Sequence, residues 1–187
     1  MPKGHKGEKR PKDVNQLAKK MVDVVPSTLV GGAAEHFVMS KLLLKGKIAA
    51  LAPKGVPNVD ILVSDQEGNH QFAIQVKGRR NGSDRGWRMH AKHEGIKRKS
   101  LFYCFVDFEV PKDVAPKCWI VPSSIVAKTV RESHQAWLTK PGRKDSTMRS
   151  FLPQYNWMKP DPKYMSGWLN KYSENWELLS LRRKISD

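Results

Sequence analysis

Residues 59–77 read VDILVSDQEGNHQFAIQVK and predict the central element of the fold, a β-hairpin. Two runs rich in β-branched and aromatic residues flank a short polar connection, which is typical of paired strands. The connection contains Gly68, which readily adopts the positive φ angle of a tight turn. If the turn is centred on Glu67 and Gly68, paired residue numbers sum to 135. Asp60 then lies opposite Gln75, with Cβ atoms roughly 5 Å apart.

Polar side chains gather on one face of this hairpin. Successive side chains of a strand point to opposite faces. Gln75 and Lys77 therefore share one face, and Ile74 and Val76 share the other. A carboxylate from Asp60, an amide and an ammonium group converge on the first face. This combination is suited to binding a divalent cation and a phosphate group.

A helix is expected near residues 31–45, and it contributes a second carboxylate. Its apolar stripe consists of Ala34, Val38 and Leu42. Gly46 is expected to end the helix. Glu35 lies at the edge of the stripe, where a carboxylate is costly unless it is paired or bound to a metal ion. The positive end of the helix dipole also favours a glutamate near the helix start, so both interpretations stand.

The other elements follow from the same periodicities. Strands are expected at 47–52, 59–64, 71–77, 101–108 and 118–121. Further helices are expected at 13–25, 123–137 and 164–179, with a helical turn within 87–96. Ser123 or Ser124 is expected to cap the helix at 123–137. Residues 139–162, rich in proline and polar residues, are expected to be mostly loop.

This order predicts an α/β fold with a mixed β-sheet flanked by helices. Residues 1–12, rich in Lys, Gly and Pro, are expected to form a basic flexible arm. Residues 13–187 are expected to form one domain. Its core would span about 31–137, and a helical extension would follow over about 138–187.

The charge predicts the class of partner. The chain has 187 residues, with 34 Lys and Arg against 18 Asp and Glu, a formal net charge of +16. Such an excess indicates a polyanion, with nucleic acid ahead of anionic lipid. No apolar run approaches the roughly 20 residues that span a membrane. The N-terminus lacks the apolar segment of a secretory signal. Cys104 and Cys118 lie in apolar runs and are expected to be buried, reduced thiols, which predicts a cytoplasmic protein.

The order Glu35, Asp60 and Gln75-x-Lys77 resembles the PD-(D/E)xK nuclease superfamily, which includes the restriction endonucleases. In that superfamily the core runs helix, strand, strand, strand, helix, strand. The first acid begins the second strand, and the (D/E)xK tripeptide lies on the third. Here PNVD at residues 57–60 corresponds to the first motif.

The chain departs from the superfamily pattern at two positions. Asp60 does not directly follow a proline, and Gln75 replaces the usual Asp or Glu. Some active members of the superfamily also carry glutamine there. An amide oxygen still coordinates a hard cation, but it contributes no charge. Glu35 is therefore expected to supply the missing carboxylate.

The resemblance implies a restriction-endonuclease-like fold and a Mg²⁺-dependent or Mn²⁺-dependent endodeoxyribonuclease. The implied metal ligands are Asp60, Gln75, Glu35 and the backbone carbonyl of Val76. Such an ion stabilises charge that develops on the phosphoryl oxygens. Lys77 is implied to hold or deprotonate the attacking water and to neutralise the scissile phosphate.

A basic segment follows Lys77 directly, with eight basic residues against two acidic ones over residues 79–99. Its basic side chains are expected to bind phosphates beside the cut, with strong salt dependence. These are Arg79, Arg80, Arg85, Arg88, Lys92, Lys97, Arg98 and Lys99. Trp87 could stack on an unpaired base, but core packing is the commoner use of a tryptophan.

His90, His93 and Glu94 form a further cluster in this segment. A zinc site would need a third and fourth ligand at suitable spacing, and the sequence offers none. The favoured interpretation makes His93 or Glu94 an acid–base helper at the site. The C-terminal aromatics Trp157, Trp168, Tyr172 and Trp176 are expected to pack in the core. They are also the first place to look for the interface of a possible homodimer.

Three functions remain open on the sequence. The first is a metal-dependent endonuclease acting on DNA rather than RNA. The second is a catalytically silent DNA-binding or RNA-binding module that retains the nuclease fold, with Gln75 reflecting decay of the site. The third is a basic protein that holds a protein partner or ribosomal RNA. Only the first requires Glu35, Asp60, Gln75 and Lys77 to converge.

Overall fold

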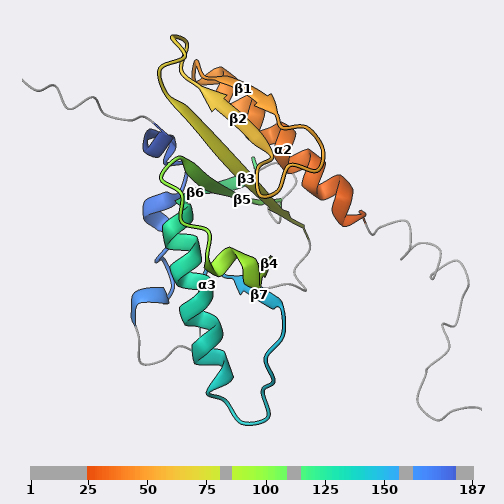
Figure 1. Ribbon diagram of the computed structural model, residues 1–187, viewed down its shortest axis with the longest axis vertical. Coiled ribbons are helices and arrows are strands. Elements are labelled where there is room, and N and C mark those ends of the chain that lie inside the picture. Colours follow the sequence, from red (N-terminus) through yellow and green to blue (C-terminus); the bar gives the residue numbers. More distant parts are fainter. Residues whose placement is uncertain (1–24, 81–85, 109–114, 156–161, 180–187) are drawn as a thin grey trace, which may run out of the picture.

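A computed structural model describes residues 25–80, 86–108, 115–155 and 162–179. The expected basic arm and nearly all of the expected helix at 13–25 lie outside these ranges. Five strands form one mixed sheet in the order β1-β2-β3-β5-β6 (Figure 1). The strands are β1 (Ile48–Leu51), β2 (Ile61–Ser64), β3 (Gln71–Arg79), β5 (Leu101–Asp107) and β6 (Lys117–Pro122). Strands β3 and β5 are parallel, and the other neighbours are antiparallel.

Two long helices flank the sheet, α2 (Ser27–Leu44) and α3 (Ser123–Leu138). Helix α2 buries its predicted stripe against β2 and β3 (Figure 1). It begins four residues before the expected start, directly after Pro26, and Gly46 ends it with a φ of +72°. The predicted fold class, a mixed β-sheet flanked by helices, is therefore confirmed.

Strand β5 explains how the sheet separates two cores. All seven of its residues are buried, and they alternate between the two faces. Phe102, Cys104 and Val106 pack with the residues of α2. Leu101, Tyr103 and Phe105 pack with residues of α3 on the opposite face. A strand covered on both faces reads as a continuous apolar run, which is why the sequence predicts it well.

A second sheet, of two strands, lies on the α3 side of the main sheet. The sequence predicts neither of its strands. This sheet pairs β4 (Trp87–His90) with β7 (Met148–Phe151), which falls in the segment expected to be loop. The predicted helical turn is confirmed as a 3₁₀ turn, η1 (Ala91–Glu94), directly after β4. Trp87 is 1% exposed, and its Nε1 donates to the carbonyl of Val106 at 3.0 Å. Its role is therefore core packing.

The predicted C-terminal helix at 164–179 is wrong. The segment forms three short 3₁₀ turns, η2 (Pro162–Tyr164), η3 (Asn170–Tyr172) and η4 (Trp176–Leu179). Positive φ angles at Gly167 and Glu174 are incompatible with a continuous α-helix. Ser173 instead forms a β-bridge with Trp119, and the Glu174 amide donates to the Cys118 carbonyl at 3.0 Å.

The spacing of the C-terminal aromatics reflects packing, as expected, although the backbone is not helical. Tyr172 and Trp176 are buried, and Trp168 is partly buried. Trp157 lies outside the described residues. Among the described helices, none is long and apolar enough to cross a membrane.

The expected capping of α3 by a serine is also wrong. Pro122 precedes the first turn, and no side chain caps it. The Ser123 hydroxyl instead accepts the Arg98 amide at 2.9 Å and donates to the Arg98 carbonyl at 2.8 Å. Cys104 and Cys118 are buried free thiols, as predicted.

Helix α2 approaches β3 closely at Gly78. A Cβ atom built on Gly78 would lie 2.8 Å from the Ala34 Cβ and 3.0 Å from the Val30 carbonyl oxygen. Only glycine permits this spacing, because the nearest atoms belong to or adjoin the helix backbone. The close approach brings Glu35, the neighbour of Ala34, toward the strand that carries Lys77.

We expect Gly78→Ala to lower the free energy of unfolding by about 1–3 kcal/mol, because helix and strand must separate to admit the methyl group. Urea denaturation of the purified protein measures this. Gly31→Ala is the matched control, because no atom outside the adjacent helix backbone lies within 4 Å of its Cβ position. That change should be neutral or stabilise the helix by about 0.5–1 kcal/mol. Equal effects of the two changes would contradict the steric argument.

Candidate active site

The predicted hairpin register is confirmed. Ile61 pairs with Ile74, and Leu62 pairs with Ala73, so the residue numbers of each pair sum to 135. The backbone N–H of Asp60 also donates to the Ile74 carbonyl, at 2.8 Å, so the backbone departs from this register by one residue at Asp60. The Asp60 side chain nevertheless reaches the Gln75 side chain, at the point where β2 begins.

The Asp60 carboxylate takes the place of a strand partner. Strand β3 extends past the start of β2, so the N–H of Val76 faces an open edge. Asp60 Oδ2 accepts this N–H at 2.6 Å and also accepts Gln75 Nε2. The N–H and C=O of one strand residue point to the same edge, so the Val76 carbonyl faces the Asp60 side as well.

Gln75 presents its amide nitrogen to Asp60. Its oxygen therefore points away from the carboxylate. Gln75 is 7% exposed, so the amide is nearly enclosed. In this arrangement Gln75 holds Asp60 in place. Coordination of an ion shared with Asp60 through the Gln75 oxygen would require the amide to turn over.

Glu35 approaches the same point from α2. Burial raises the pKa of its carboxyl group, and the nearby Asp60 charge raises it further. His36 and Lys77 act in the opposite direction on this pKa. The two carboxylates and the Lys77 ammonium are thus close enough to interact electrostatically.

The charges of Asp60 and Lys77 are only partly compensated. Burial raises the pKa of Asp60, although the hydrogen bond from Val76 and the Lys77 charge oppose the rise. Burial lowers the pKa of Lys77, and Lys92 lowers it further, against the effect of Asp60. Each of these groups therefore loses more hydration than its protein partners restore. A bound cation would restore part of this stabilisation to the carboxylates.

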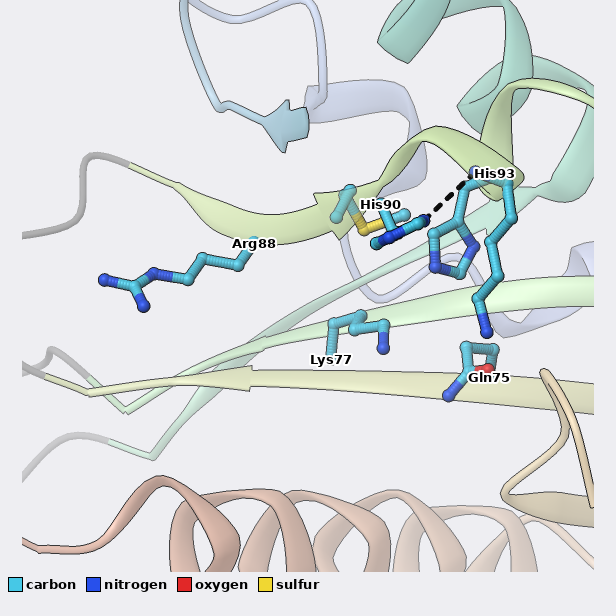
Figure 2. Close-up of a pocket in the computed structure, with 7 residues that line it drawn as sticks. Gln75, Lys77, Arg88, His90 and His93 are labelled. Carbon is cyan, nitrogen blue, oxygen red and sulfur yellow. Dashed lines mark hydrogen bonds between the residues drawn. The ribbon is translucent and has the colours of Figure 1, made fainter. Parts of the chain in front are cut away.

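An open cleft of about 400 Å³ lies on the β3 face that carries Gln75 and Lys77. Figure 2 shows both side chains and the ring of His93 within it, with His90 and Arg88 on the β4 side. A second hollow of about 380 Å³ adjoins it, because Lys77 and Arg88 line both. Together they form a groove that runs from η1 past Lys77 toward the first turn of α2.

His93 is a buried member of the cleft wall. Its Nδ1 is hydrogen-bonded to the Tyr103 hydroxyl at 2.7 Å. Burial lowers the pKa of His93 to about 4, and the charges of Lys77 and Lys92 contribute to the shift. The ring is therefore neutral near pH 7. Burial also raises the pKa of the Tyr103 hydroxyl.

Tyr103 was not anticipated from the sequence. The alternation along β5 indicates which face it shares, but its position beside Gln75 depends on the parallel register of β3 and β5. No turn chemistry fixes that register, because parallel strands are joined by long connections.

Glu94 is held by one ion pair and one hydrogen bond to its backbone carbonyl. Its carboxylate binds Arg149 Nε, and its carbonyl accepts Arg131 Nη2 at 2.5 Å. Arg149 is itself buried and donates to the carbonyls of Ser146 and Met148. Glu94 thus anchors η1 to β7 and α3. The sequence predicts His93 or Glu94 as an acid–base helper. His93 lines the cleft, whereas Glu94 pairs with Arg149 and does not line it.

Neither zinc nor another three-ligand metal site is formed by side chains of His, Cys, Asp or Glu within the described ranges. His90 Nδ1 instead accepts the Lys92 amide at 3.4 Å. Any ion at the candidate site would depend on two carboxylates together with neutral oxygens.

The basic residues divide into three groups. Arg80, Arg88 and Lys92 line the groove beside Lys77. Arg79 also lines it, but its guanidinium binds the Asp107 carboxylate at 2.5 Å and lies 4.5 Å from the centre of the Trp87 ring. Lys97, Arg98 and Lys99 are exposed between η1 and β5 and line neither hollow. Arg85 lies outside the described residues.

Comparisons with known proteins include a distant structural likeness. No family model and no curated protein matches the sequence. Among solved structures, the chain is similar to a bacterial homing endonuclease, I-Ssp6803I, at 12% identity and a TM-score of 0.46. The alignment covers 83% of this chain and 92% of that chain.

The buried His93 predicts a pH-dependent stability. The unfolded chain protonates this residue near its ordinary pKa of 6.5, and the folded chain only near 4. Between these values the unfolded state binds more protons, so stability falls as the pH decreases. This residue should remove about 2 kcal/mol of unfolding free energy between pH 7 and pH 5.

Urea denaturation at pH 7 and pH 5 measures the effect, with His93→Gln for comparison. The variant lacks the titrating ring, so its loss between the two pH values should be about 2 kcal/mol smaller. An identical loss in both proteins would show that His93 is protonated as easily in the folded state as in the unfolded state.

Proposed function

We propose that the chain is a metal-dependent endonuclease that hydrolyses DNA phosphodiester bonds. The observation that carries the proposal is that Asp60 is bound at the open edge of β3 and interacts electrostatically with both Glu35 and Lys77. Burial raises the pKa of both carboxyl groups and lowers that of the amine. Perturbed groups of both signs near one another are typical of a catalytic site.

The donor atoms fit a hard cation such as Mg²⁺ or Mn²⁺. Asp60 and Glu35 supply carboxylate oxygens, and the Val76 carbonyl faces the same edge. Oxygen ligands of this kind are those that Mg²⁺ prefers. When bound, the ion would stabilise negative charge on the phosphoryl oxygens and orient water. Gln75 holds Asp60 through its amide nitrogen and could add an oxygen if the amide turned over.

Lys77 would act on the water and on the phosphate. Its lowered pKa increases the fraction of neutral amine, which can accept a proton from water. In its charged form it would neutralise the scissile phosphate. The nearby Arg80, Arg88 and Lys92 would bind phosphates on either side along the groove. The net charge of +16 supports a polyanionic substrate.

A silent nucleic-acid-binding module remains the second candidate, because one observation favours it. Asp60 Oδ2 already accepts two hydrogen bonds, from Val76 and from the amide of Gln75. A site organised in this way persists without any ion. This module would use the same basic groove but would not depend on metal.

Cleavage assays separate the two functions. We expect wild-type protein with Mg²⁺ or Mn²⁺ to cleave plasmid or branched DNA. Asp60→Asn and Lys77→Gln should each reduce the rate by at least about 100-fold, because each removes a group that acts on the reacting atoms. EDTA should abolish cleavage.

Asp65→Asn is the matched control, since Asp65 pairs with His70 at the far end of the hairpin, with 2.6 Å between Oδ2 and Nδ1. It should cleave at the wild-type rate. Absence of cleavage, with DNA binding that neither EDTA nor the two site variants change, would favour the silent module. Cleavage that persists in both site variants would disprove the assigned site.

Gln75→Glu tests the metal separately from catalysis. The new carboxylate would repel Asp60 in metal-free protein and lower the unfolding temperature. With an added charge among the ligands, Mg²⁺ affinity should rise by at least about tenfold. Thermal unfolding across a Mg²⁺ series measures both effects, because a ligand of the folded state raises the midpoint.

Gln71→Glu is the control for Gln75→Glu. Gln71 lies on the same face of β3 but pairs with Ser64 at the other end of the hairpin. The control should show the wild-type response to Mg²⁺. If neither wild type nor Gln75→Glu responds to Mg²⁺ or Mn²⁺, the site does not bind a metal ion.

A further inference from the structure

A pocket of about 480 Å³, separate from the groove at Lys77, lies between α3 and the C-terminal turns η2 and η3. It shares no lining residue with the groove at Lys77. In Figure 1 these C-terminal segments run along α3. The proposed nuclease reaction uses none of its residues.

The floor of the pocket is apolar and contains a fixed indole. Ile125, Trp168 and Tyr172 contribute to it. Trp168 Nε1 donates to the Leu152 carbonyl at 3.2 Å, which fixes the ring. The indole also packs edge-on against Tyr164, with 5.2 Å between the ring centres. Because Trp168 remains partly exposed, the pocket has a rigid aromatic surface.

The rim is cationic. Lys128, Lys163 and Lys171 line it, and no Asp or Glu does. The nearest acid on α3, Glu132, lies 2.9 Å from Lys163 and 3.9 Å from Lys128, and it also accepts the Tyr164 hydroxyl. One carboxylate thus binds two of the three ammonium groups. Lys171 lies 5.1 Å from the centre of the Tyr172 ring. The pocket therefore favours an anion with a flat, apolar body.

The geometry points to an unpaired nucleotide as the ligand of this pocket. Its base would lie against Trp168 and Ile125, and its phosphate would contact Lys128 and Lys171. Stacking on an aromatic side chain combined with lysine contacts to phosphate is the usual basis of single-strand binding without sequence preference. The pocket volume falls within the range of sites for small ligands. The large positive charge of the chain favours this anion over an acyl chain with a carboxylate.

The test follows the Trp168 indole N–H by ¹H–¹⁵N NMR, with the signal assigned from Trp168→Phe. The probes are thymidine monophosphate, an eight-residue oligothymidylate, a blunt duplex and decanoate. We expect the oligothymidylate to shift this signal in a saturable manner. A stronger response to the oligomer than to the monophosphate would assign the site to a single strand, and an equal response would assign it to a free nucleotide.

The lysines are tested by the double variant Lys128→Gln, Lys171→Gln, which changes no aromatic residue of the pocket. Oligothymidylate binding at Trp168 should weaken at least about fivefold, as expected for two lost phosphate contacts. The control with equal charge loss is Lys54→Gln, Lys144→Gln, at exposed positions that line neither cleft.

Equal weakening in the two double variants would overturn the proposal, as would a Trp168 shift that only the duplex or only decanoate produces. Because the assay detects binding at Trp168 and uses no metal, its outcome is independent of cleavage at Asp60. Loss of one proposal leaves the other intact.

Discussion

The backbone of β3 continues beyond the start of β2, and its exposed N–H at Val76 must find an acceptor. An unpaired amide inside a protein costs about as much as a lost hydrogen bond. Asp60 supplies the acceptor at 2.6 Å, which draws its carboxylate into the plane of the sheet. From there it interacts with Lys77 on one face and with Glu35 on α2. The need of the Val76 N–H for a hydrogen-bond acceptor thus positions the Asp60 carboxylate among the charged groups of the candidate site.

The parts that the sequence predicts well are governed by neighbouring residues. The hairpin register follows from one turn with a positive-φ glycine, Gly68, and so the approach of Asp60 to Gln75 is predictable. Strand β5 is predictable because both of its faces are buried. The apolar stripe of α2 likewise specifies which side of the helix meets the sheet, although its first turn begins earlier than the stripe indicates.

The parts that the sequence does not predict depend on contacts between distant segments. Strand β7 is short, and only its pairing with β4 makes it a strand. The aromatic spacing from Trp168 to Trp176 imitates a helix, but a bridge to β6 and positive φ angles divide the segment into turns. The place of Tyr103 beside His93 depends on a parallel register that no local signal specifies.

The ion pair between Glu94 and Arg149 affects the order in which the cleft forms during folding. Lys92 and His93 form one wall of the cleft, and Glu94 ties that wall to Arg149, a residue 55 positions later. The hairpin that carries Asp60 and Gln75 forms through local contacts. The cleft wall at η1, in contrast, cannot be fixed before β7 supplies Arg149. Contacts of high sequence separation form late, because the intervening chain must first close into a loop. During synthesis, a chain that has emerged only through β6 can therefore hold the paired Asp60 and Gln75 without an assembled cleft. Assembly of the cleft wall is thereby deferred until β7 has been made.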